Sequence, residues 1–227
     1  MIVSEKHNLI TQVEFYRSNT QLKERAWDVL EAHVIAADQA GQMLASILLD
    51  IDCFHTLFDE LEPEAVQTIL TQCQEHLQAL ALEKQASALS YGRDEFLFLQ
   101  VVQGMEEAMF QTEQVRWQLT EKLRAAMPLV GLAKDGKVSC SAGLAVYPLH
   151  AHEAMALLGK AEEGLYLAKR QGRNQTRLPS RDSMVLKANY YSQVQLERLS
   201  ALAKKLGQTE AALLREALNR LLSDYDI

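Results

Sequence analysis

Apolar residues in the first two thirds of the chain form short runs between polar segments. Residues 47–54 read Ile-Leu-Leu-Asp-Ile-Asp-Cys-Phe, an apolar run typical of a buried strand that ends in acidic residues. Residues 88–91 and 96–99 are two further predicted strands, and a two-residue turn formed by Gly92 and Arg93 is expected to join them as a hairpin. The pattern therefore predicts a sheet with carboxylates gathered where its strands end.

A helical pattern precedes these strands. Residues 21–32 place Ala26, Val29 and Leu30 on one side, as in an amphipathic helix. We expect this helix to pack on the sheet, with a partner helix as the alternative.

The pattern restarts after a polar, proline-bearing segment at residues 178–183. We predict a linker there, between a first domain at residues 1–177 and a second at residues 184–227. Residues 184–191 alternate like one strand.

Two amphipathic helices are predicted after that strand. Ser192 and Gln195 have the spacing of a capping box that opens the first helix, Gly207 supplies its end, and Thr209 caps the second. The apolar faces consist of Leu196, Leu199, Ala203 and Leu206 in the first helix and of Leu214, Ala217, Leu218, Leu221 and Leu222 in the second. Because a unit of roughly 45 residues cannot bury such faces alone, we expect it to form a homodimer.

Charge separates the two parts of the chain only mildly. Residues 181–227 carry seven Lys and Arg against six Asp and Glu, whereas the whole chain of 227 residues has a net charge of −7. This balance argues against broad nonspecific binding to nucleic acid or to an anionic membrane. Apolar runs of membrane-spanning length and an N-terminal signal core are both missing, so we expect a cytoplasmic protein with no membrane partner.

Asp50 and Asp94 are candidate metal ligands, because both stand where predicted strands end. Magnesium takes oxygen ligands and is usually held by only one or two protein carboxylates, with phosphate oxygens and water completing the shell. The two aspartates therefore predict a Mg²⁺ site that accompanies a bound nucleotide. The alternative is that they only form turns or interact with solvent.

Four segments carry a resemblance to a known family: residues 49–54, 92–96, 138–148 and 161–174. In this order they resemble the GGDEF domains, the diguanylate cyclases that join two GTP molecules into cyclic dimeric GMP, over residues 1–178. The resemblance implies an α+β fold with a mixed sheet and covering helices.

The resemblance also implies roles for single residues. Asp50 and Asp94 match the family's metal ligands, and Glu95 would be catalytic if the domain is an active enzyme. The nucleotide-binding residues that it implies are Phe54, Arg93, Lys169 and Arg173.

Several positions depart from the family pattern. Phe58 and Gln67 stand where the family reads guanine, and His55 replaces a phosphate-binding lysine. Arg93 replaces the second signature glycine, where its side chain either blocks the phosphate path or grips a phosphate. Residues 83 and 86 lack the charged pair of the inhibitory product site. These losses predict a degenerate, catalytically impaired cyclase.

Residues 183–225 resemble a ribbon-helix-helix module, in which two strands pair and enter the major groove of DNA. The polar alternation of the strand leads us to place Lys187, Asn189 and Tyr191 toward the bases, although aligning Leu199 and Gly207 with the family would turn Lys187 and Asn189 inward. The resemblance also implies that Gln208 and Thr209 lie near a backbone phosphate. The alternative is a dimerisation strand with a solvated outer face.

Together these features predict a dimeric transcription regulator that binds operator DNA and whose impaired GGDEF-like domain senses a nucleotide or mediates assembly. The first alternative is an active nucleotidyltransferase with altered base choice that also binds DNA. The second is a ligand-free spacer or interaction platform attached to the DNA-binding module.

Overall fold

The computed structural model describes residues 2–55, 61–127, 138–180, 190–206 and 208–224. The chain divides into two compact units, Met1–Pro179 and Ser180–Ile227.

The first unit is built on a five-stranded mixed sheet in the order β2-β3-β1-β4-β5. Its strands are β1 (Met43–Ile51), β2 (Ser87–Ser90), β3 (Glu95–Val102), β4 (Cys140–Tyr147) and β5 (Thr176–Arg177). The central strand β1 runs antiparallel to its neighbours β3 and β4, whereas β4 and β5 run parallel to each other. The predicted strands and the predicted α+β fold are thus confirmed, with shifted strand ends.

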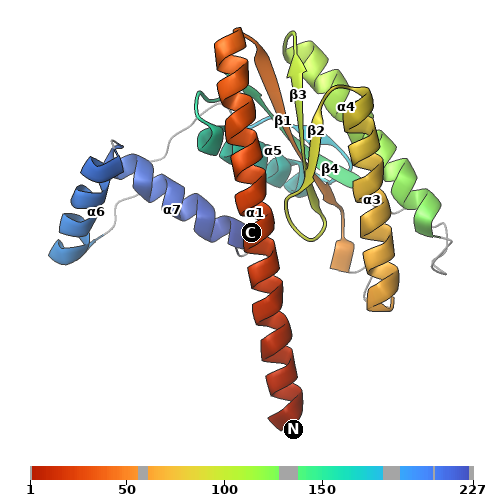
Figure 1. Cartoon of the computed structure of the whole chain (residues 1–227), viewed down its shortest axis with the longest axis horizontal. Helices are drawn as coiled ribbons and strands as arrows, with labels where there is room; N and C mark the ends of the chain where they lie inside the picture. The colour runs from red at the N-terminus through yellow and green to blue at the C-terminus, as the bar shows by residue number, and fades with distance from the viewer. Residues whose placement is uncertain (1, 56–60, 128–137, 181–189, 207, 225–227) are drawn as a thin grey trace. The chain divides into compact units, whose positions relative to one another are not determined.

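Helices cover both faces of this sheet (Figure 1). They are α1 (Ile2–Ala40), α3 (Pro63–Glu83), α4 (Met105–Ala126) and α5 (Ala154–Arg170). Ile47 and Leu49 of β1 join the core beneath α3 and α4, while Leu44 and Leu48 join the core beneath α1 and α5. A strand covered on both sides needs apolar residues at every position, which explains the continuous run in the sequence.

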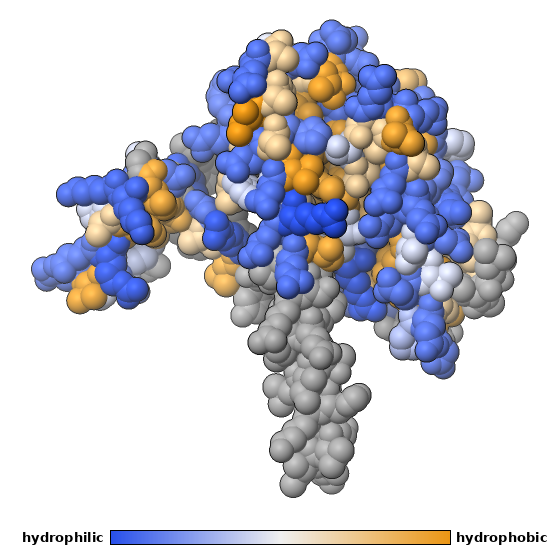
Figure 2. Space-filling model, in the orientation of Figure 1, coloured by the Kyte–Doolittle hydropathy of each residue, from blue (hydrophilic) through white to orange (hydrophobic). Residues whose placement is uncertain are grey.

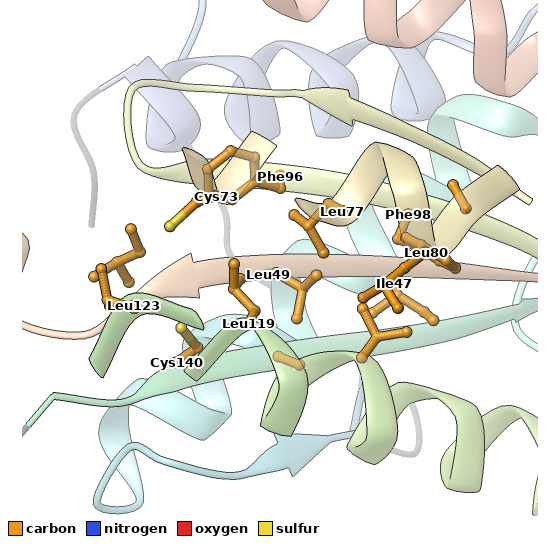
Figure 3. Close-up of a cluster of buried hydrophobic side chains, with 14 of the residues drawn as sticks. Ile47, Leu49, Cys73, Leu77, Leu80, Phe96, Phe98, Leu119, Leu123 and Cys140 are labelled. Atoms are coloured by element: carbon orange, nitrogen blue, oxygen red, sulfur yellow. The ribbon is translucent and has the colours of Figure 1, made fainter. Parts of the chain in front are cut away.

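Figure 3 shows the core on the side of α3 and α4, where Leu77 and Leu80 of α3 and Leu119 and Leu123 of α4 cluster with side chains of the sheet. On the opposite face, Ala26 and Leu30 of α1 are fully buried. The prediction that the first helix packs on the sheet is therefore confirmed.

Helix α5 approaches β4 unusually closely at two glycines. A Cβ atom on Gly143 would lie 1.9 Å from the carbonyl oxygen of Ala161, and one on Gly164 would lie 3.1 Å from the Cα of Gly143. Because no side chain fits between them, the two backbones touch, and this contact fixes the height of α5 above the sheet.

The predicted two-residue hairpin is wrong in its length. Strand β2 ends at Ser90 and β3 begins at Glu95, so Tyr91–Asp94 form the connection. The amides of Tyr91 and Gly92 both donate to the carbonyl oxygen of Glu95, at 2.9 and 3.2 Å. The Tyr91 hydroxyl also donates to Glu162 of α5 at 2.5 Å. The wider turn thus follows from Tyr91, which turns its ring inward rather than continuing the strand.

The second unit contains α6 (Gln193–Leu206) and α7 (Glu210–Asp224), which confirms the two predicted helices. The capping box is also confirmed, because the Ser192 amide donates to Oε1 of Gln195 at 2.9 Å and the Gln195 amide donates to Oγ of Ser192 at 3.3 Å. Of the predicted strand at residues 184–191, only Tyr190 and Tyr191 are described, and neither is in a strand. The ribbon-helix-helix fold therefore stays a prediction.

Candidate active site

The candidate site lies where β1 ends, at Asp50. In the sheet, Asp50 faces Glu95 of β3 on one side and Ser141 of β4 on the other. The amide of Ile51 donates to the carbonyl oxygen of Asp94 at 3.2 Å, which fixes the end of the hairpin against β1. Pairing within the sheet therefore brings Asp50, Asp94 and Glu95 to one place, although 43 positions of sequence separate the first two.

Lys169, in the last turn of α5, reaches this group of acids. Its Nζ lies 2.8 Å from Oδ2 of Asp50, whose side chain is only 4% exposed. Burial raises the pKa of the Asp50 carboxyl well above its usual value; the positive charge of Lys169 opposes that shift, and the negative charges of Asp94 and Glu95 add to it. The ionised Asp50 is therefore costly in this position, and a further cation would stabilise it.

The donor set fits a magnesium ion that arrives with phosphates. Asp50 and Asp94 are hard oxygen ligands on adjoining strand ends, and Mg²⁺ usually needs only one or two such carboxylates. Within the part of the chain that the structure describes, three or more His, Cys, Asp or Glu side chains do not converge as a complete metal cage. The residues present therefore suit an ion that shares its coordination with a nucleotide.

The hairpin places Arg93 over an aromatic ring. The guanidinium carbon of Arg93 lies 4.9 Å from the centre of the Phe54 ring, and Phe54 is only 3% exposed. A Cβ atom on Gly92 would lie 2.6 Å from Oε2 of Glu95, so a larger residue here would displace the Glu95 carboxylate. The hairpin sequence thus turns Arg93 toward Phe54, and the exposed cation covers the buried ring.

Asp52 has a role that the sequence did not suggest. It is 2% exposed and accepts hydrogen bonds from the hydroxyls of Ser139 and Ser141, each at 2.6 Å, and from the amide of Asn174 at 3.1 Å. Asn174 and its neighbour Arg173 both adopt positive φ, at 49° and 62°. Asp52 therefore holds the loop after α5 in an unfavourable backbone conformation and so positions Arg173.

Arg116 of α4 supports the same loop from the other side. Its guanidinium donates to Oδ1 of Asn174 at 2.6 Å and to the carbonyl oxygen of Cys140 at 3.1 Å. Glu113 forms an ion pair with Arg116 at 2.8 Å. The sequence pattern of α4 does not single out Arg116, just as that of residues 138–148 does not single out Ser139 and Ser141 as partners of Asp52.

The structure brings five of the predicted nucleotide and metal residues into two contacts. Asp50 meets Lys169 beside Asp94, and Phe54 meets Arg93. Arg173 is exposed in the loop past α5.

The predicted DNA-binding residues are only partly described. Lys187 and Asn189 lie outside the described residues, whereas Tyr191, Gln208 and Thr209 are exposed around the two helices of the second unit. None of the described helices is long and apolar enough to span a membrane.

A comparison with family models gives a match to the diguanylate cyclase GGDEF domain over residues 19–175. The chain belongs to this family. The match includes every element that contributes to the candidate site, from β1 to the loop that carries Arg173.

Relatives of the GGDEF chain are signalling proteins. It is 29% identical over 153 residues to an uncharacterized signaling protein from Caulobacter vibrioides, covering 67% of this chain and 18% of the relative. It is 24% identical over 167 residues to diguanylate cyclase A from Treponema denticola, covering 71% of this chain and 43% of the relative. The chain thus spans less than half of the length of these curated relatives.

Solved structures show the same fold. The GGDEF domain of TpbB from Pseudomonas aeruginosa superposes with a TM-score of 0.57 and 24% sequence identity, covering 70% of this chain and 96% of that domain. At this identity the likeness concerns the fold alone.

The predicted DNA-binding transcription regulator is wrong. The family match and the named relatives identify a diguanylate cyclase signalling domain instead. That prediction rested on the expected strand at residues 184–191, the two amphipathic helices and the ribbon-helix-helix resemblance, but an apolar helix face indicates only that something covers it.

Proposed function

We propose that the first unit is a nucleotidyltransferase of the diguanylate cyclase type with altered base choice. It binds nucleoside triphosphates with Mg²⁺ and joins them when a 3′-hydroxyl attacks an α-phosphate. The observation that carries this proposal is the buried Asp50 carboxylate, which lies between two further carboxylates and the ammonium of Lys169 at 2.8 Å. A site of this kind combines ligands for a hard cation with a partner for a phosphate.

The pairing of Asp50 with Lys169 suggests how the site accepts its charged substrate. Asp50 and Asp94 would hold Mg²⁺, which neutralises triphosphate charge when bound. Lys169, which is paired with Asp50 in the structure, would be the partner of a phosphate oxygen, while Asp50 would be one of the residues that hold the metal. The Asp50 carboxylate, whose side chain is 4% exposed, would have an opposite charge nearby with or without the nucleotide, so this buried group would not be left unpaired.

Glu95 and Arg173 complete the assignment. Glu95 lies directly across from Asp50 in the sheet and is the candidate to accept the proton of the attacking hydroxyl. Arg173 is held by the loop that Asp52 fixes, and its exposed guanidinium can bind a phosphate from the edge of the site.

Gln67 and Arg93 support altered base choice. Of the two positions that stand where the family reads guanine, Gln67 is described, whereas Phe58 lies outside the described residues. Gln67, on α3, is exposed, and its side-chain amide donates to the hydroxyl of Thr71 at 3.5 Å. Arg93 covers Phe54 with a flat cation, and a base can stack on a guanidinium without a specific hydrogen-bonding edge. We therefore expect a weaker preference for guanine than a hydrogen-bonding pocket would give.

The test is to incubate the full chain with each of the four labelled nucleoside triphosphates and Mg²⁺ or Mn²⁺. We expect a dinucleotide product that disappears in an Asp94→Ala variant and persists in Glu75→Gln, which changes an exposed acid on α3. Calorimetric titration of the same nucleotides separates binding from chemistry. Neither heat nor product with any nucleotide would contradict the proposal, and heat without product would reject the transferase while retaining the site.

A further inference from the structure

Tyr91 connects the hairpin between β2 and β3 to two helices. Helix α1 passes close to this hairpin (Figure 1), and Figure 2 shows hydrophilic side chains at the surface there. The ring of Tyr91 is only 4% exposed and belongs to the core that α1 and α5 cover. Its hydroxyl donates to Oε1 of Glu162 of α5 at 2.5 Å, and Nζ of Lys23 of α1 lies 5.3 Å from the centre of the ring. One buried side chain therefore contacts both helices.

The backbone of Tyr91 is tied to Glu95, the candidate proton acceptor. The amides of Tyr91 and Gly92 share the carbonyl oxygen of Glu95 as their acceptor, at 2.9 and 3.2 Å. A shift of Tyr91 would therefore also shift Glu95. A displacement of about 1 Å can slow a reaction that depends on orientation by about 100-fold, so the position of Tyr91 matters for the chemistry.

Helix α5 contacts the site at two points. Glu162 and Lys169 are seven positions apart, about two helical turns, so they lie on the same side of α5. Glu162 holds the start of the hairpin through Tyr91, while Lys169 pairs with Asp50 at 2.8 Å. The same helix thus fixes the hairpin and the end of β1 relative to each other.

The polar contacts of Tyr91 add orientation rather than packing. A phenylalanine would fill the same space in the core, but it would offer no donor to Glu162. A hydroxyl that donates to a carboxylate forms one of the stronger hydrogen bonds in proteins, and a cation over an aromatic ring adds a further attraction. The contacts with Glu162 and Lys23 therefore hold the ring in one direction.

We propose that Tyr91 is a positioning residue, held by Glu162 and Lys23, which sets the place of Glu95 without touching the nucleotide. This inference rests on the proposed function for the role of Glu95, whereas the contacts themselves can be measured without activity. Because Lys23 belongs to α1, a change in that helix should reach the hairpin through the same ring.

Hydrogen exchange of the full chain measures the hairpin directly. Tyr91→Phe keeps the ring and removes the hydroxyl, so it should speed the exchange of the amides at residues 91–96 by about 10-fold. Glu162→Leu should do the same, and the double variant should lose no more protection than either single one, because all three remove one hydrogen bond. Glu162→Gln keeps an acceptor oxygen and should retain most of the protection.

Two matched controls lie on α5. Tyr166→Phe and Glu163→Gln make the same exchanges of residue type at positions that are open to solvent. Both should leave the exchange of the hairpin amides and the turnover unchanged.

Turnover separates positioning from a purely structural role. Tyr91→Phe should lower kcat by about 10-fold or more with KM nearly unchanged, because the hydroxyl orients Glu95 and does not bind the nucleotide. Lys23→Met should lower kcat by about two- to five-fold, and Lys23→Arg, which keeps the cation, should restore it.

Two results would overturn the proposal. Hairpin amides that stay as protected in Tyr91→Phe as in the wild type would show that the hydroxyl does not hold the hairpin. Faster exchange with an unchanged kcat would show that the contact only stabilises the fold. If the wild-type chain forms no product, the proposed function fails, and the role of Tyr91 then stands or falls on the exchange of the hairpin alone.

Discussion

Helices α5 and α7 have similar amphipathic patterns but very different surroundings. In α5 the apolar face is buried against the sheet, with Leu157 fully covered and Leu165 only 4% exposed, whereas in α7 Leu218 and Leu221 are each more than half exposed. Helix α5 is covered by other elements of its own unit, which has about 180 residues. Helix α7 belongs to a unit of fewer than 50 residues, which covers little of its apolar face. The comparison shows that an amphipathic pattern predicts burial without specifying the covering surface.

The two units should therefore respond differently to substitution. In the first unit, backbone contact and buried hydrogen bonds fix the site, so small changes should have large effects. In the second unit, the described side chains are mostly exposed, so a change should matter little unless it touches a helix cap.

Gly143→Ala should have the largest effect. The added methyl group would meet the backbone of Ala161 at 1.9 Å and that of Leu165 at 2.2 Å, and neither can rotate away. Helix α5 must lift from β4, which removes Lys169 from Asp50 and costs about 3 kcal/mol or more of unfolding free energy. Urea unfolding followed by circular dichroism measures the loss.

Gly104→Ala is the matched control for that substitution. A Cβ atom at Gly104 has open space within 4 Å, and the residue precedes α4 in an extended conformation. Its unfolding free energy should stay within about 1 kcal/mol of the wild type. Equal losses in the two variants would mean that the close approach of α5 and β4 is not what stabilises the site.

Asp52→Ala should cause the second-largest loss of unfolding free energy. It leaves two buried serine hydroxyls and the Asn174 amide without their shared acceptor, which should cost about 2–4 kcal/mol. Hydrogen exchange should quicken in the loop around Arg173, while the amides of β1 stay protected. Asp52→Asn keeps the size of the side chain and one acceptor oxygen and should lose less; an Asp52→Asn variant as stable as the wild type would argue that Asp52 acts only by filling space.

Asp50 and Asp52 illustrate what the sequence could predict. The apolar run and its acidic end were sufficient to place a buried strand and to select Asp50, because strand ends commonly carry ligands. The role of Asp52 depends on serines almost ninety positions later in the sequence, and only the pairing of β1 with β4 brings them together. Long-range pairing of this kind leaves no local signal.

The hairpin and the second unit show two other limits of local patterns. Gly92 and Arg93 suggested a two-residue turn. In the structure, Tyr91 instead points toward α5 and donates to Glu162, so Tyr91 belongs to the turn rather than to the strand and the turn is longer. For α6 and α7 the sequence pattern correctly predicted the two helices and the cap at Ser192. The prediction of DNA binding was wrong, because an amphipathic pattern shows that a helix has an apolar face but not what that face binds.

Asp50→Asn should raise stability while removing function. Because the pKa of Asp50 in the folded protein lies well above its ordinary value of 3.8, the folded state favours the protonated form. The stability that this group contributes is therefore complete below the ordinary value and is lost as pH rises through the raised one. Asparagine does not titrate, so the variant's advantage should grow with pH to a Tm gain on the order of 2–4 °C near neutrality.

Two measurements examine the Asp50→Asn variant. Thermal unfolding across a pH series gives the difference in Tm, and calorimetry should show the loss of Mg²⁺-dependent nucleotide binding. Lys169 keeps access to water because its side chain is 28% exposed, so it does not become a buried, unpaired charge. A Tm gain that shrinks as pH rises would show that the ion pair with Lys169 outweighs the cost of burying Asp50.

Ser192→Ala should have the smallest effect and one confined to the second unit. The substitution removes the hydroxyl that accepts the Gln195 amide at the start of α6, a loss of about 1 kcal/mol. Ser200→Ala is the control, because it makes the same exchange in the middle of α6, where no cap is needed. Its effect on the free energy of unfolding should be neutral or slightly stabilising. Hydrogen exchange should therefore quicken in α6 for the first variant alone, with the sheet of the first unit unchanged in both. If the amides of β1 or β3 also lost protection in Ser192→Ala, the two units would fold as one cooperative body, and the contrast between α5 and α7 would reflect a shared core rather than two separate ones.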